Sequence, residues 1–270
     1  MTHCPHSTPF NISATAGFYS IVAGVMAGFA FISLSYFITA PHRAGDGQGE
    51  QRDKYNLAVQ ALGAAFVALL LSCIAYAVMA GEHLPGGRAS TIEVFAGCGF
   101  ALAAIQLFYA IVLIIQAHHP EILPIQRFFE SVGGFLCLLA YVLIAEGVSD
   151  YQEARDDRAG NIVYWWGWSL LFILLVSLIC AWRSRTRYRI EMPALRNPAY
   201  FTMGMAAVGI TATSVGAATL GECQTASPFL MVLILALTCG ALANQIVWFF
   251  QPPTVFRQPM LRRRRADAAP

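Results

Sequence analysis

The segment IEVFAGCGFALAAIQLFYAIVLIIQA, residues 92–117, decides the fold class, because Glu93 is its only charged residue. A helix needs roughly 20 consecutive apolar residues to cross the hydrocarbon core of a bilayer, and this segment exceeds that length. Six further segments of the same kind occur at residues 14–39, 56–80, 127–146, 161–182, 199–220 and 228–250. We therefore predict an all-α integral membrane bundle of seven transmembrane helices.

The composition supports a membrane domain with short loops. The chain has 270 residues, of which 57% are hydrophobic and 12% are charged, whereas soluble domains carry about 25% charged residues. The first apolar segment follows no basic stretch and is too long for a signal-peptide core, so we expect it to remain as a helix. We predict a short outer tail at residues 1–13, a transmembrane domain at 14–250 and a basic cytoplasmic tail at 251–270.

The basic residues orient the predicted bundle. With the N-terminus outside and the C-terminus inside, the outer segments hold only Arg88, Arg155 and Arg158 of the 17 Lys and Arg. Cytoplasmic loops are typically enriched in Lys and Arg, which favours this orientation. The chain has a single lysine, Lys54, beside many Arg, Ala and Gly. We read this composition as that of a GC-rich genome, which favours the plasma membrane of a bacterium, its inner membrane.

Several classes of membrane protein do not fit the sequence. All six histidines lie outside the predicted spans, which disfavours a haem held by two histidines. Lys54 lies in a predicted loop, so a retinal Schiff base in the last helix is disfavoured. No charged residue lies near the middle of a span, which disfavours a proton-coupled pump. We predict no catalytic residue, no cofactor and no metal site, and no nucleic-acid partner, because no domain would present a reading surface.

Polar side chains in the predicted third and seventh spans form a candidate polar cavity. An amide at bilayer depth must find a hydrogen-bond partner. One interpretation is that these side chains bind the helices to one another, and the alternative is that they line a channel or a facilitative path for a small neutral solute. The candidate residues are Gln106, Tyr109, Asn244 and Gln245.

The predicted outer side carries a cluster of acidic residues and two cysteines. Clustered carboxylates can bind Ca²⁺ or Mg²⁺, but the spacing favours a solvated loop. An enzyme at the outer surface would need Glu93, Glu146 or His83 to converge, which the sequence does not indicate. Cys4 and Cys223 both fall in outer, oxidising segments, where a disulfide between them can form. The acidic residues are Glu146, Asp150, Glu153, Asp156 and Asp157.

Two features suggest partners in or at the membrane. Gly24 and Gly28 form a small-xxx-small pair, which favours close helix packing within the chain or in a homo-oligomer. Basic clusters just inside a membrane attract anionic lipid, by about 1 kcal/mol per residue. We expect a non-enzymatic membrane component that contacts lipid or a partner protein. The candidate lipid-contacting residues are Arg183, Arg185, Arg187, Arg189, Arg262, Arg263, Arg264 and Arg265.

Overall fold

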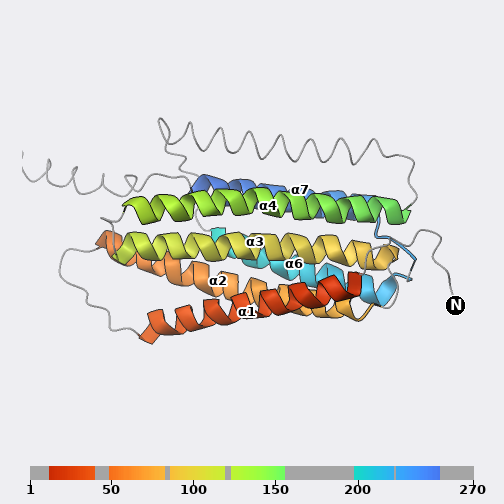
Figure 1. Ribbon diagram of the computed structural model, residues 1–270, viewed down its shortest axis with the longest axis horizontal. Coiled ribbons are helices and arrows are strands. Elements are labelled where there is room, and N and C mark those ends of the chain that lie inside the picture. Colours follow the sequence, from red (N-terminus) through yellow and green to blue (C-terminus); the bar gives the residue numbers. More distant parts are fainter. Residues whose placement is uncertain are drawn as a thin grey trace, which may run out of the picture.

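The computed structural model describes residues 12–39, 49–82, 86–118, 123–155, 198–221 and 223–249. These residues form only helices and turns, and the helices lie side by side along the long axis of the molecule (Figure 1). The all-helical prediction is therefore confirmed for the described part of the chain. The helices are α1 (Ile12–Thr39), α2 (Gly49–Ala80), α3 (Gly87–His118), α4 (Leu123–Arg155), α6 (Pro198–Thr219) and α7 (Pro228–Phe249).

Five of these helices, α1, α2, α3, α4 and α7, are long and apolar enough to cross a membrane. Helix α6 is not one of the five. Its hydropathy is lowered by small or polar residues, among them Gly209, Thr213 and Gly216. The chain thus has several apolar helices, as a membrane protein requires. The predicted span at 161–182 and both predicted tails lie outside the described residues. The count of seven and the orientation stay predictions.

Helix α3 lies at the centre of the described bundle, and α1 lies at its edge. The most apolar part of α3 is 78% buried, and the helix contacts α1, α2, α4, α6 and α7. The corresponding part of α1 is only 22% buried. Large side chains on α1, such as Phe18, Ile21 and Phe29, are more than half exposed. A soluble protein rarely exposes so large an apolar patch, whereas lipid would cover this face.

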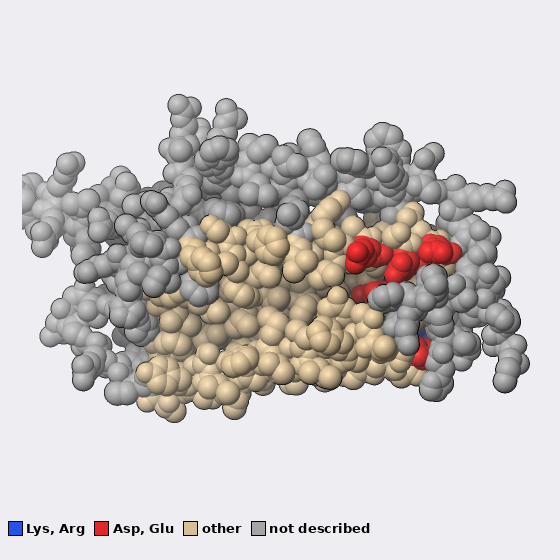
Figure 2. Space-filling view, in the orientation of Figure 1, with Lys and Arg blue, Asp and Glu red and all other residues tan. Residues whose placement is uncertain are grey.

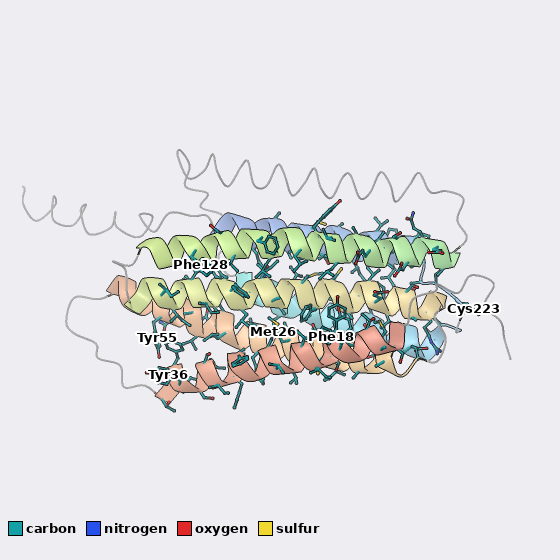
Figure 3. The ribbon with its side chains drawn as sticks, viewed as in Figure 1. Phe18, Met26, Tyr36, Tyr55, Phe128 and Cys223 are labelled. Atoms are coloured by element: carbon teal, nitrogen blue, oxygen red, sulfur yellow. The ribbon has the colours of Figure 1, made fainter. Side chains whose placement is uncertain are left out.

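Small residues at alternating spacings of three and four join α1 to α2. Ala16, Ala23, Ala27 and Ala30 are each at most 3% exposed, and this spacing places them along one side of the helix. The Ser20 hydroxyl donates to the Cys73 carbonyl at 3.1 Å. At the two ends of this seam the Ser13 hydroxyl donates to the Ala80 carbonyl at 2.7 Å, and the Tyr55 hydroxyl donates to the Phe37 carbonyl. Figure 3 shows Tyr55 near the end of α1 that also carries Tyr36.

Helix α4 continues well past the predicted end of its span at residue 146. Its last turns keep the periodicity of a helix with one buried face, because Ile144, Val148 and Tyr151 are each at most 6% exposed. The expectation of a solvated loop from Glu146 onward is therefore wrong for the described residues. Glu146, Asp150 and Glu153 lie on a helix instead.

The carboxylates whose side chains the structure describes gather at one end of the bundle, which we call the acidic end. There α2 and α4 finish, and α1 and α3 begin (Figure 1). Figure 2 shows the acidic patch at this end and a long stretch beside it with no charged side chain among the described residues. The acidic residues with described side chains are Glu82, Glu93, Glu146, Asp150 and Glu153.

Candidate functional site

A polar tie joins three helices in the interior of the bundle. The Gln245 amide of α7 donates to the Thr202 hydroxyl of α6 at 2.7 Å and to the Gln106 carbonyl oxygen of α3 at 3.1 Å. The Thr202 hydroxyl donates to the same oxygen of Gln106 at 3.2 Å. The three side chains are each at most 2% exposed. We call Gln106, Thr202 and Gln245 the polar tie.

The tie differs from several other buried hydroxyls, which donate within their own helices. The Ser72, Thr91 and Thr238 hydroxyls each donate at 2.8 Å to the carbonyl four residues earlier. A hydroxyl can satisfy itself in this way because its short side chain reaches the preceding turn. The longer amides of Gln106 and Gln245 instead bond across helices, so they fix how α3 and α7 lie against each other.

Two of the four residues predicted to line a polar cavity meet in the structure, namely Gln106 and Gln245. Tyr109 is buried in the main hydrophobic core, one turn along α3 from Gln106, and Asn244 is half-buried. Thr202 was missed by sequence reasoning because it lies in the first turns of α6, among many other small polar residues. The cavity itself stays a prediction. Contacts between the described side chains favour the interhelical interpretation.

Carboxylates from two helices converge at the acidic end, which the sequence did not indicate. Glu93 of α3 interacts electrostatically with Asp150 and Glu146 of α4, and one of its carboxylate oxygens is buried without a hydrogen-bond partner among the described residues. Helices α3 and α4 pack closely here, because a Cβ on Gly147 would be in van der Waals contact with Val94 Cγ2 at 3.4 Å and with Glu93 Cγ at 3.7 Å. His83 lies outside the described residues, so no set that combines it with Glu93 and Glu146 is placed by the structure.

The connection between α6 and α7 is held against the acidic end by four contacts. We call its described residues, 220, 221 and 223–227, the clamped loop. The Arg88 guanidinium, which also pairs with Glu82 at 2.6 Å, donates to the Leu220 carbonyl at 3.2 Å. The Ala226 amide donates to the Thr91 hydroxyl at 3.1 Å, and the Ala226 carbonyl accepts from the Tyr151 hydroxyl at 2.7 Å.

The fourth contact is a close backbone approach at Gly87, the first residue of α3. A Cβ on Gly87 would lie 2.8 Å from the carbonyl carbon of Gln224 and 2.9 Å from the Cys223 carbonyl oxygen. Atoms do not approach so closely, so only glycine fits here. Cys223, labelled in Figure 3, lies in this loop and is disulfide-bonded. The clamped loop is thus held against α3 and α4 at the acidic end.

The remaining predicted sites are only partly within the described residues. Cys4 lies outside them, so its pairing with Cys223 stays a prediction, and Cys73, Cys98, Cys137 and Cys239 are free. Among the described residues, no group of three or more His, Cys, Asp or Glu is placed to hold a metal ion. The eight arginines predicted to contact lipid, from Arg183 to Arg189 and from Arg262 to Arg265, also lie outside.

Among the described residues, the Gly24 and Gly28 pair does not form one packing face. A Cβ on Gly24 would lie 3.6 Å from the Cys73 sulfur of α2, whereas a Cβ on Gly28 would meet nothing within 4 Å. The packing face of α1 is instead the neighbouring row of alanines. A homo-oligomer through Gly28 stays a prediction.

Comparison with known proteins gives no relative for this chain. No protein-family model, curated protein or solved structure matches it. A function must therefore be argued from the geometry of the polar tie and of the acidic end.

Proposed function

We propose that this chain is a non-enzymatic, multi-pass membrane protein that acts through contacts with lipid and with a partner protein. The observation that carries the proposal is the polar tie. Its three side chains, each at most 2% exposed, bond to one another across α3, α6 and α7. Hydrogen bonds between membrane helices average only ~0.6 kcal/mol, which suits a structural role in a bundle otherwise held by packing.

The connectivity of the described helices supports seven spans. Helix α4 finishes at the acidic end, where Tyr151 contacts the clamped loop. Helix α6 also finishes there, because Leu220 follows it and contacts Arg88. Helix α6 therefore begins at the opposite end, and residues 156–197 connect the two ends. One further crossing by the apolar residues 161–182 would satisfy this requirement.

The sorting of charge supports an orientation with the acidic end outside. The carboxylates whose side chains the structure describes lie at that end, while the arginines at 183–189 and 262–265 fall on the predicted cytoplasmic side. Basic loops favour the cytoplasm and bind anionic lipid there. We propose that the chain is located in the bacterial inner membrane.

The experiment is native mass spectrometry of the chain extracted in lipid discs. We expect a stoichiometric protein or an anionic lipid to remain bound. A variant with Arg183, Arg185, Arg187 and Arg189 changed to Gln should lose that species. The control variant, Glu153→Gln, changes a charge at the acidic end and should keep it. A chain that carries neither protein nor lipid, and that turns over a small molecule instead, would refute the proposal.

A further inference from the structure

Two atoms of the polar tie have no hydrogen-bond partner among the described residues. They are the amide nitrogen Nε2 of Gln106 and the amide oxygen Oε1 of Gln245. Gln106 is 0% exposed and Gln245 is 2% exposed. A buried polar group without a partner is unfavourable, and native proteins pair nearly all such groups. We therefore expect each of these two atoms to have a hydrogen-bond partner.

The Leu102 carbonyl explains why the two atoms face away from the tie. This oxygen lies 3.3 Å from the Gln245 amide nitrogen and can only accept a hydrogen bond, so Gln245 must present its NH₂ group there. The same NH₂ group lies 3.1 Å from Gln106, which must then present its oxygen. Turning over either amide, or both, would bring two donors or two acceptors together.

The two unpaired atoms are complementary, because one is a donor and the other an acceptor. Each is bonded to the same carbon as an atom of the 3.1 Å hydrogen bond between Gln106 and Gln245. A single occupant of the site would lie beside this bond and contact both atoms. It must accept from the Gln106 nitrogen and donate to the Gln245 oxygen. The tie consists of two amides and a hydroxyl, which carry no charge to compensate an ion, and a charge at bilayer depth is costly.

We propose that Gln106 and Gln245 form an internal binding site for one small neutral molecule that both donates and accepts hydrogen bonds. Water, a short primary amide or a short alcohol has this chemistry. The bound molecule completes the hydrogen bonding of the tie without replacing any of its bonds. The site lies at the junction of α3, α6 and α7, and it extends the role of these residues beyond helix packing.

The test uses the full chain in lipid discs and two amides, of which only one can donate a hydrogen bond. Acetamide donates and accepts hydrogen bonds, whereas N,N-dimethylacetamide only accepts. We expect acetamide to raise the melting temperature saturably and N,N-dimethylacetamide not to. In the second arm, solid-state NMR of the Gln106 side-chain amide detects a bound water. A water contact there, with no effect of acetamide, identifies water as the occupant and supports the site.

Two outcomes would overturn the proposal. One is the absence of both a water contact at Gln106 and an effect of acetamide. The other is an equal effect of the two amides without a water contact, which indicates bulk solvation. Gln106→Met removes the donor at similar length and should weaken the acetamide effect by about tenfold. Gln245→Met removes the acceptor and should do the same.

A control variant tests whether the loss of any buried polar group, and not only of the site, removes the response to acetamide. Thr238→Val removes a buried hydroxyl of α7 that lies outside the polar tie and donates to the Ile234 carbonyl of its own helix at 2.8 Å. It should keep the full response to acetamide. If both Met variants fail to fold, the NMR arm still decides, because it uses the unaltered chain.

Discussion

Replacing Gly87 by alanine should loosen the clamped loop at the acidic end. The added Cβ would lie 2.8 Å from the Gln224 carbonyl carbon and 2.8 Å from the Thr225 methyl carbon. Carbon atoms pack best at about 3.5–4.0 Å, so the loop must move away by roughly 1 Å. The Gln224 carbonyl carbon and the Cys223 carbonyl oxygen, which would lie 2.8 and 2.9 Å from the new Cβ, belong to the backbone. A side-chain rotation therefore cannot relieve the clash.

The magnitude follows from the bonds that this movement would stretch. The Ala226 amide and carbonyl bond to Thr91 and Tyr151 at 3.1 and 2.7 Å, and the Leu220 carbonyl bonds to Arg88 at 3.2 Å. At about 1 kcal/mol each, their loss would cost at most about 3 kcal/mol. Overpacking of a tight site typically costs 1–3 kcal/mol, so about 2 kcal/mol is the expected loss in the free energy of unfolding.

The assay combines reversible unfolding in bicelles with hydrogen exchange of residues 223–227. Gly87→Ala should lower stability and speed exchange in this loop, with little change in α1. The matched control is Gly28→Ala, where the new Cβ meets nothing within 4 Å and a helical Gly-to-Ala change gains roughly 0.5–1 kcal/mol. Equal stability of the two variants, with unchanged exchange in the loop, would refute the reasoning.

Three further predictions concern the bundle. Gln106→Leu and Gln245→Leu should each cost about 1–2 kcal/mol in a bicelle unfolding assay, and the double variant should cost no more than either, because neither glutamine amide is then left without the other. Ala27→Leu should cost about 1–3 kcal/mol in the same assay, because Ala27 is 3% exposed in the seam with α2. Peptide mapping without reductant should recover Cys4 linked to Cys223.

Each of these predictions has its own control. For the two glutamines, additive losses would contradict the tie. For the seam, Gly28→Leu is the neighbouring change on an open face and should cost far less than Ala27→Leu. For the cysteines, a reduced sample should yield separate peptides, and a link from Cys223 to another cysteine would exclude the predicted pair.

The apolar spans were predictable from sequence because their physical cause is local. Five of the predicted segments reappear as long apolar helices, and the α1 prediction of residues 14–39 differs from Ile12–Thr39 only at its start. The end of α4 was misplaced because hydropathy falls after Glu146 while the helical periodicity continues to Tyr151. A search for buried positions at helical spacing would have found this extension.

Contacts between helices were harder to predict, because they depend on how helices rotate against each other. Gln106 and Gln245 were singled out as amides that need partners, and they bond to each other in the structure. Thr202 was not, since a hydroxyl usually satisfies itself within its own helix. The α1 seam was sought among glycines at Gly24 and Gly28, although Ala16, Ala23, Ala27 and Ala30 follow one another at spacings of seven, four and three residues. That spacing is the signal that would have located it.

The seam between α1 and α2 also bears on how the protein is made. Its contacts join two helices that are consecutive in the chain, from the pair Ser13 and Ala80 at one end to the pair Phe37 and Tyr55 at the other. Contacts close in sequence form fast, because little chain entropy is lost before they are made. The first two helices can therefore pair as a hairpin while later helices are still being synthesised. Helix α3, which is synthesised next, would then pack against the preformed pair of α1 and α2, and the rest of the bundle would follow.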